Sequence, residues 1–324
     1  MICRSNYTAI ARSGVSLDTH TFGKYRFTPH GVYSSIANAA NSPEAPPEGW
    51  DYVVVTTKAL PDVTDDARDI EPLIRAGQTC IVLIQNGVGV EEPHRRRFPT
   101  NPIVSAVTII SAEQTRPGVV RQNRWTRISM GAYGDGYGGG DDQKKSLSVR
   151  GDQCARELCR ILTEYGQLRD AEWHDETGLQ LIRWHKICIN GSMNPSAVLS
   201  GGIGNALMVR DPDLRAHLKG CMEEIFAAVP RILGREFPAS LATPDKILAS
   251  TERNAAAAKP SMLLDWEAAK PMELEVILGN PTRIARAHGV EMPRLQTLYA
   301  LLKSAGKVRD EKKKKQQSER SSKI

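Results

Sequence analysis

Three short, continuous apolar runs mark the first half of the chain. They cover residues 52–56, 79–84 and 103–110, and they are rich in Val and Ile. Such runs are typical of strands in a sheet that is covered on both faces. Between the first two runs, residues 62–76 repeat their apolar positions with helical spacing. Strands that alternate with helix-length segments predict a parallel α/β sheet.

The strand pattern stops near residue 175, and helical patterns follow one another after it. Several of these segments begin at Pro, Asp, Thr or Ser and end near Gly, as the ends of helices prefer. The predicted helices cover residues 177–194, 213–233, 244–257, 261–265, 272–288 and 294–304. The second half of the chain is therefore predicted to be all-helical.

A glycine-rich insertion at 134–140 could be mistaken for the linker between two domains. The segment 153–166 that follows it is amphipathic with a helical period, so we interpret it as a further crossover helix of the sheet layer. We therefore expect an α/β domain over residues 1–175 and an all-α domain over residues 176–306. A length of 324 residues is consistent with two domains.

The net charge of +6 is confined to the end of the chain. Residues 303–324 contain nine basic and three acidic residues, whereas the rest of the chain contains 34 of each. The body therefore offers no basic surface of the kind that binds nucleic acid. The tail, 307–324, has no aromatic and few apolar residues, so we expect it to be disordered. Its lysines at 312–315 indicate a solvated chain end, with a localisation signal or a site for an acidic partner as the alternative.

The cysteines and the apolar runs indicate an intracellular, cytoplasmic protein. Six cysteines are scattered, without a CxxC motif or a His at the spacing of a zinc site, so we expect no metal. Cys80 and Cys188 lie in apolar runs and are interpreted as reduced core residues. No apolar run approaches the ~18 residues of a membrane-spanning helix, and the first residues do not resemble a signal peptide. We therefore expect no membrane partner.

One predicted helix carries an unusual stripe of polar residues. Lys186, Asn190 and Asn194 are spaced four apart, so they share one face of the helix. Their neighbours are largely apolar, and Asn is a poor residue for the middle of a helix because it competes for backbone hydrogen bonds. The stripe is either a solvated surface or a polar wall that faces a ligand. In the second case Lys186 would have the tunable pKa that a general acid requires.

Polar residues also follow two of the predicted strands. Lys58 comes after the first strand, and Asn86 lies in the sequence Gln-Asn-Gly-Val-Gly after the second. Ligands of open α/β sheets bind beyond the carboxyl ends of the strands, and glycine lets the backbone approach them closely. A plain turn from strand to loop is the alternative interpretation.

Two further candidates lie in the helical half. Ser261 precedes an apolar run, a position at which Ser is most often a helix cap. Glu273 and Glu275 flank Leu274 and would point in different directions on a helix. At most one of these two carboxylates is therefore expected to share a site with the other candidates.

Taken in order, these motifs resemble the ketopantoate reductases (2-dehydropantoate 2-reductases), the NADPH-dependent enzymes of pantothenate synthesis. The resemblance covers nearly the whole chain, and its weight lies in the order and spacing of the motifs. They are CRSNY at the start, DYVVVTTKAL, LIQNGVG, RWHKICINGSMNP, PSMLLDW with Glu273 twelve positions after Ser261, and MPRLQTLYALL. The resemblance implies a Rossmann-like dinucleotide-binding domain followed by a helical domain.

The resemblance also implies a role for each candidate residue. Lys186 would be the general acid that protonates the substrate carbonyl oxygen, and Glu273 would hold the substrate hydroxyl. Arg4 would pair with the 2′-phosphate that distinguishes NADPH from NADH. The remaining candidates divide into substrate-binding residues, Asn190, Asn194 and Ser261, and further cofactor-binding residues, Lys58 and Asn86.

The chain departs from the family pattern at its start. Such enzymes begin with a strand and a GxGxxG turn that holds the pyrophosphate of the cofactor at a helix N-terminus. The GxGxxG spacing occurs in this sequence only at residues 134–139, after the third predicted strand rather than the first, and residues 2–4 correspond to the end of the second strand of the family. We therefore expect the chain to be N-terminally incomplete, with the first strand and helix of the sheet missing. Pro260 also stands where the family commonly has a second Ser.

The predicted function is the NADPH-dependent reduction of 2-dehydropantoate to pantoate in the biosynthesis of pantothenate and coenzyme A. One alternative is a reductase of another 2-oxo acid or of a secondary metabolite on the same scaffold. The other is a non-catalytic truncated paralogue that acts as a binding protein. An in-frame strand–GxGxxG–helix segment upstream in the genome would favour the enzyme. The expected partner is a small 2-oxo acid, and a homodimer remains open.

Overall fold

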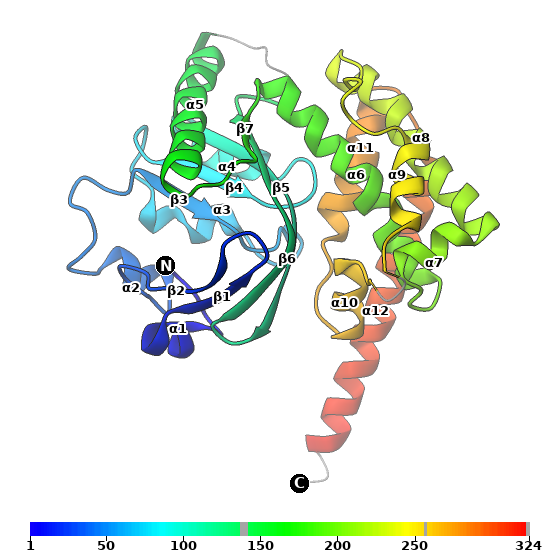
Figure 1. The fold of residues 1–324 in the computed structure, drawn as a ribbon, viewed down its shortest axis with the longest axis horizontal. Coiled ribbons are helices and arrows are strands. Elements are labelled where there is room, and N and C mark those ends of the chain that lie inside the picture. Colours follow the sequence, from blue (N-terminus) through cyan, green and yellow to red (C-terminus); the bar gives the residue numbers. More distant parts are fainter. Residues whose placement is uncertain (137–141, 256–257, 322–324) are drawn as a thin grey trace. The chain divides into compact units, whose positions relative to one another are not determined.

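The structure, a computed structural model, describes residues 1–136, 142–255 and 258–321 (Figure 1). The chain forms two compact units. The first comprises Met1–Thr57, Asp65–Gln85 and Glu91–Leu179, and the second comprises Lys58–Thr64, Asn86–Val90 and Gln180–Ile324. We expected a division at residue 175, but we did not expect two loops from the α/β half to join the helical unit. These two loops carry Lys58 and Asn86.

The first unit is built on a mixed sheet with the strand order β2-β1-β6-β5-β4-β3, and β7 pairs with β6. Strands β3, β4 and β5 are parallel, as predicted, whereas β5 pairs with β6 and β1 with β2 in antiparallel fashion. The antiparallel part corrects the expectation of a purely parallel sheet. The strands are β1 (Val15–Thr19), β2 (Gly23–Phe27), β3 (Tyr52–Val55), β4 (Cys80–Ile84), β5 (Ile103–Arg116), β6 (Val119–Ala132) and β7 (Ala171–Trp173).

Strand β4 is buried on both faces, which explains its continuous apolar sequence. Ile81 and Leu83 pack into one core cluster, and Cys80 and Val82 pack into another. All four side chains are at most 1% exposed. Successive side chains of a strand point to opposite faces, so a central strand needs apolar residues at every position.

The sequence analysis missed strands β1, β2, β6 and β7, and most of their residues are exposed or only partly buried. All five residues of β2 are exposed, as is much of the distal half of the β5–β6 hairpin. A solvated ribbon needs no apolar period, so nothing in its sequence marks it. Residues 2–4, interpreted as the end of a strand, form only an isolated bridge between Ile2 and Tyr33.

The helices of the first unit are short except for α5, which packs on the core cluster that contains Cys80. The predicted helix at 62–76 is broken into α3 and a 3-10 turn, because Pro72 has no N–H to continue the α-helical hydrogen bonds. The helical elements are α1 (Tyr7–Ser13), α2 (Ile36–Ala40), α3 (Asp66–Asp69), η1 (Glu71–Leu73), α4 (Glu92–Arg97), α5 (Asp142–Arg160) and the π-helix η2 (Ile161–Tyr165).

The glycine-rich insertion predicted at 134–140 lies mostly outside the described residues. Its described part wraps around a carboxylate. The backbone N–H groups of Gly134, Asp135 and Gly136 all donate to Oε1 of Glu176, at 2.7 to 2.9 Å. This contact ties the end of β6 to the start of α6.

The second unit is helical and surrounds one large apolar core. The core takes Trp184 and Ile187 from α6 and Leu218 and Ile225 from α8, each at most 2% exposed. The predicted helices are all present with shifted ends, and α7 was missed. The elements are α6 (Glu176–Leu199), α7 (Asn205–Arg210), α8 (Pro212–Leu233), α9 (Pro244–Glu252), α10 (Ser261–Glu267), the π-helix η3 (Glu275–Gly279), α11 (Asn280–Ala287) and α12 (Pro293–Ser321).

The tail differs from its prediction. We expected 307–324 to be disordered, whereas 307–321 continue helix α12 and 322–324 lie outside the described residues. Leu295, Leu298 and Leu302 bury the first part of α12 in the core. Lys, Glu, Gln and Arg are strong helix formers, so a helix that has already formed can extend through a sequence that could not fold alone.

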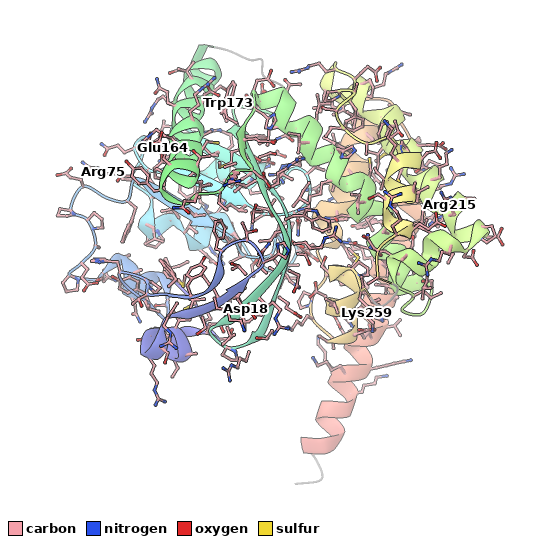
Figure 2. The ribbon with its side chains drawn as sticks, viewed as in Figure 1. Asp18, Arg75, Glu164, Trp173, Arg215 and Lys259 are labelled. Atoms are coloured by element: carbon pink, nitrogen blue, oxygen red, sulfur yellow. The ribbon has the colours of Figure 1, made fainter. Side chains whose placement is uncertain are left out.

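Ion pairs on the outside of both units add little to stability. Arg75 pairs with Glu48 and Arg215 with Glu252, and these arginine side chains are 43% and 37% exposed (Figure 2). Exposed pairs of this kind contribute about 0–1 kcal/mol each. The apolar clusters are therefore the main source of stability in each unit.

Candidate active site

A chain of hydrogen bonds in the second unit joins three of the predicted site residues. Lys186 Nζ donates to Oδ1 of Asn86 at 2.9 Å, and Asn86 Nδ2 donates to Oε2 of Glu273 at 3.2 Å. The backbone N–H of Ala59 donates to the other oxygen of Glu273 at 3.1 Å. The residues come from helix α6, from the two loops that follow β3 and β4, and from the segment before η3. The structure therefore brings Lys186, Asn86 and Glu273 together.

Lys186 lies on α6 between residues that belong to the core. Trp184 and Ile187 are 2% and 1% exposed, so the backbone of Lys186 is held against the apolar core. Burial, together with the nearby charge of Arg183, lowers the pKa of Lys186 to about 8, and Glu273 limits this shift. An amine with a pKa near 8 is charged at neutral pH and still gives up its proton readily. Both properties suit a general acid.

The loop 86–90 is docked tightly onto η3. Gly87 has a φ of +91°, and a Cβ at this position would overlap the side chain of Val276. Val88 N donates to the carbonyl of Val276 at 2.9 Å, and Asn280 Nδ2 donates to the carbonyl of Val88 at 2.9 Å. These contacts fix the part of the loop that directly follows Asn86.

Pro281 explains why η3 can bind this loop. A π-helical turn pairs a carbonyl with the N–H five residues later, and for Val276 that residue is Pro281, which has no N–H. The carbonyl of Val276 is then available to the N–H of Val88. The sequence Asn280-Pro281 is thus part of the machinery that places Asn86, and the sequence analysis did not single it out.

Glu273 and Glu275 serve different networks, as their spacing predicted. Glu275 accepts hydrogen bonds from Tyr299 at 2.5 Å, from Lys303 at 2.9 Å and from Arg283 at 2.8 Å. Burial alone would raise the pKa of Glu275, but these three donors outweigh it and lower the pKa to about 2. Glu275 therefore anchors η3 to α12, whereas Glu273 contacts Asn86.

Lys58 forms an ion pair with Asp265, a partner that the sequence analysis did not identify. Asp265 lies on α10, four residues after Ser261, so the two share one face of that helix. Ser261 is exposed at the start of α10. Among the residues that the structure describes, no hydrogen bond joins Ser261 to Glu273.

Asn190 and Asn194 follow Lys186 on the same helix. They lie one and two turns beyond it, Asn190 half-buried and Asn194 only 3% exposed. In the part of the chain that is described, neither is hydrogen-bonded to Glu273, so their roles remain predictions. Arg4 is exposed and belongs to the first unit.

Arg183 is a further member of the site that the sequence analysis missed. It is 2% exposed, and its Nη1 donates to the carbonyl of Gly87 at 2.8 Å. The available signal was its position, one helical turn before Lys186 and directly between the apolar residues Ile182 and Trp184. An arginine there cannot lie in the core without a polar partner.

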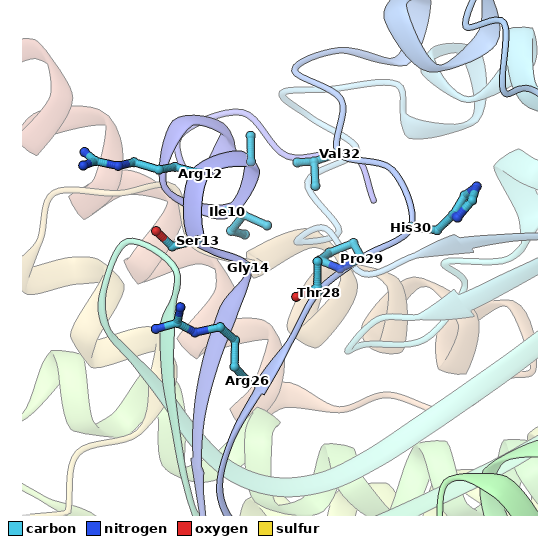
Figure 3. Close-up of a pocket in the computed structure, with 10 residues that line it drawn as sticks. Ile10, Arg12, Ser13, Gly14, Arg26, Thr28, Pro29, His30 and Val32 are labelled. Carbon is cyan, nitrogen blue, oxygen red and sulfur yellow. The ribbon is translucent and has the colours of Figure 1, made fainter.

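A separate hollow of about 430 Å³ lies in the first unit (Figure 3). Its charged lining residues are Arg12, Arg26 and His30, which come from the end of α1, from β2 and from the loop after it. None of the predicted site residues lines it. All three of these side chains are exposed, so this hollow is a surface feature rather than an enclosed site.

Neither a membrane helix nor a metal site is found in the described parts. Over residues 1–136, 142–255 and 258–321, no helix is both long and apolar enough to cross a bilayer. Over the same residues, no three His, Cys, Asp or Glu side chains are grouped as metal ligands.

Comparison with known proteins identifies relatives along the whole chain. An uncharacterised protein of Saccharomyces cerevisiae is 28% identical over 326 residues, which cover 93% of this chain and 85% of the relative. A 2-dehydropantoate 2-reductase of Nostoc is 23% identical over 310 residues, covering 93% and 86%. The crystal structure of 2-dehydropantoate 2-reductase from Methylococcus capsulatus superposes with a TM-score of 0.73 at 29% identity, over 94% of this chain and 87% of that one.

Two family models match the two halves of the sequence. The model described as ketopantoate reductase PanE/ApbA matches residues 1–135, and the model of its C-terminal part matches residues 178–306. The Rossmann-like first unit and the helical second unit are the fold shared with the solved structure. The order of the motifs, the fold and both matches agree: the chain belongs to the ketopantoate reductase family.

Proposed function

We propose that the protein is an oxidoreductase that reduces 2-dehydropantoate to pantoate with NADPH, and that Lys186 is its general acid. The observation that carries this proposal is the Lys186–Asn86–Glu273 chain, in which a lysine with a pKa of about 8 is held beside a carboxylate. We further propose a cytoplasmic enzyme of pantothenate and coenzyme A biosynthesis, a location that its six free cysteines fit.

Reduction of a ketone to an alcohol requires a hydride at carbon and a proton at oxygen. A bound NADPH would supply the hydride. The ammonium of Lys186 donates the proton to the carbonyl oxygen of the substrate, and Asn86 Oδ1 holds that ammonium in place. The neutral amine then regains a proton from solvent, which is rapid for a group whose pKa is close to the working pH.

Glu273 orients the substrate. Ala59 and Asn86 each donate one hydrogen bond to it, one to each carboxylate oxygen. A carboxylate has about four acceptor positions, so both oxygens can accept a further bond from the substrate hydroxyl. Asn190, Asn194 and Ser261 supply neutral donors for the substrate carboxylate in this proposal.

The cofactor fits the described residues only in part. Arg4 is exposed and offers a cation to the 2′-phosphate. Lys58 and Asn86 follow the parallel strands β3 and β4, where dinucleotides bind in such sheets. The GxGxxG spacing occurs in the sequence only at residues 134–139, after the third predicted strand and not between a first strand and helix, where the pyrophosphate is held in such folds. We therefore assign the 2′-phosphate to Arg4 and assign no residue to the pyrophosphate.

The experiment measures turnover of a panel of 2-oxo acids by the 324-residue chain with millimolar NADPH. We expect ketopantoate to be preferred, and we expect Lys186→Ala to lower kcat by about 10²–10⁴. Lys219→Ala is the matched control, because Lys219 is an exposed lysine that pairs with Asp245. If another 2-oxo acid is preferred, the proposed substrate is wrong but the proposed reaction class stands.

Calorimetry with pantoate separates catalysis from binding. We expect Lys186→Ala to bind pantoate while losing turnover. A wild-type chain that binds pantoate but reduces no 2-oxo acid would identify a binding protein and overturn the proposal.

A further inference from the structure

We propose that Arg183 is a positioning residue of this site, which holds the Asn86 loop against helix α6 through the carbonyl of Gly87. The inference rests on the proposed function and deepens it. Asn86 places the Lys186 ammonium, and Arg183 places the loop that carries Asn86. The proton donor is therefore positioned by one direct contact, from Asn86, and by one indirect contact, from Arg183 through Gly87.

The contacts form a closed ring. Arg183 Nη1 donates to the carbonyl of Gly87 at 2.8 Å, and the preceding residue, Asn86, accepts from Lys186 at 2.9 Å. Arg183 and Lys186 are three residues apart on α6, so they lie on the same face. Two adjacent loop residues are thus fixed by two side chains that are one helical turn apart. This arrangement fixes both the distance and the direction of the loop.

Burying a guanidinium costs folding free energy, which indicates that Arg183 has a function at this position. It is 2% exposed, and taking a charged side chain out of water costs several kcal/mol unless polar partners compensate. A neutral side chain could fill the same space without that cost. Its charge has a second effect, because it lies near the Lys186 ammonium and lowers the pKa of that amine.

The loop has other anchors, so a change at Arg183 need not unfold the unit. Val88 is held on both its N–H and its carbonyl, by Val276 and by Asn280. Loss of Arg183 would leave these bonds in place and free only the Asn86 end of the loop. The expected consequence is a misplaced proton donor in a folded protein.

The experiment compares Arg183→Met, Arg183→Lys and the wild-type chain, with Arg231→Met as the control. Arg231 is exposed on α8, so the control makes the same chemical change away from the site. The lysine amines are labelled by reductive ¹³C-methylation, and the Lys186 signal, identified by its absence in Lys186→Arg, is titrated by NMR. The pH dependence of kcat is measured in parallel.

We expect Arg183→Met to raise the pKa of Lys186 by about one unit, because a like charge is removed. We expect its kcat to fall about tenfold, because a small misplacement of a reacting group is enough for such a loss. Arg183→Lys keeps the charge but loses the rigid fork that reaches Gly87. Its Lys186 pKa should therefore stay close to the wild-type value while its kcat falls.

A Lys186 pKa and a kcat that are unchanged in Arg183→Met would overturn the inference. A loss of melting temperature with a normal pH profile would also overturn it, because it would show a purely structural role. If Arg183→Met does not fold, the inference is overturned by a kcat of Arg183→Lys that equals the wild-type kcat. The NMR titration needs no turnover, so its result on Arg183 is independent of whether the chain proves to be a reductase.

Discussion

At the residue scale, the chemistry of this protein depends on what surrounds a few ordinary side chains. Lys186 is useful because burial and Arg183 lower its pKa while Glu273 limits the shift. Glu273 and Glu275 are two positions apart, yet one contacts Asn86 and the other binds Tyr299, Lys303 and Arg283. The same residue type therefore has a different function at each position.

The pH dependence of turnover tests the assignment of Lys186. Because its pKa is about 8, we expect kcat to fall as the pH rises through 8 and the ammonium loses its proton. Glu273 raises the pKa of Lys186, so Glu273→Gln should lower that pKa and move the alkaline limb to a lower pH. Steady-state kinetics from pH 6 to 10 measure the shift, and a limb that moves to higher pH would contradict the assignment.

At the element scale, the long helix α6 carries Lys186 and Arg183, and an irregular element holds the loop that they contact. The π-helix η3 presents the carbonyl of Val276 to the loop 86–90, and a glycine with positive φ lets that loop approach. A π-helix costs stability and is common at functional sites. Here its function is to hold a loop that carries a site residue.

Substitution of Gly87 tests this docking. Gly87→Ala should destabilise the protein by about 2–4 kcal/mol, because it combines backbone strain at a φ of +91° with overlap of Val276. Gly234→Ala is the control, since Gly234 also has positive φ but no atom within 4 Å of the added Cβ. It should cost about 1 kcal/mol. Urea unfolding of both variants compares the two losses, and equal losses would show that the contact with Val276 is unimportant.

The carboxylate of Glu275 makes the η3–α12 contact sensitive to acid. Its pKa is lowered to about 2, so its stabilising effect is present above the ordinary carboxyl pKa of about 4.5. That effect is lost as the pH falls from about 4.5 toward 2. Tyr299→Phe removes one donor and should lower the free energy of unfolding by about 1–2 kcal/mol at pH 7.

The measurement is denaturant unfolding at pH 7 and at pH 3 for the wild type and for Tyr299→Phe. The difference between the two proteins should be smaller at pH 3, where more of the carboxyl is protonated. Equal differences at both pH values would show that the hydrogen bond does not depend on the charge of Glu275.

At the scale of the whole molecule, the chain consists of two units that are interleaved in sequence. The loops 58–64 and 86–90 leave the strands of the first unit and belong to the second. Residues from three separate parts of the chain therefore form the Lys186 site. The long helix α12 runs from the core of the second unit into an exposed, basic end.

Two truncations test where the contribution of α12 to stability ends. Arg309 lies over the ring of Trp266 at 4.6 Å and donates to the carbonyl of Lys270. Removal of residues 312–324 keeps this contact and should leave the melting temperature unchanged. Removal from Lys307 onward also removes Arg309 and should lower it by a few degrees, in line with about 1 kcal/mol for a cation–π contact. A large loss of melting temperature on removal of residues 312–324 would show that the stabilising part of α12 extends beyond Arg309.

The sequence by itself determined the elements whose residues carry a period or a spacing. Strand β4 is apolar at every position because both of its faces are covered. The edge strand β3 is equally apolar in sequence but leaves Val54 exposed, and the start of β5 buries Ser105 among its apolar residues. The helices of the second unit repeat their apolar positions every turn. The spacing of Lys186, Asn190 and Asn194 predicted one helix face, and the strand ends predicted Lys58 and Asn86. The order of these motifs was sufficient to indicate the family.

Only the tertiary structure decided which polar groups meet. Asp265 pairs with Lys58 and Arg183 reaches Gly87 across 207 and 96 residues of chain, and no local pattern encodes such distances. The exposed strand β2, the partly buried β1 and the exposed first part of β6 have no apolar period, so they are recognised only through their pairing. The helical end of α12 also depends on the buried leucines that precede it. A periodic pattern records which face is buried, whereas a hydrogen bond between distant residues exists only once the chain has folded.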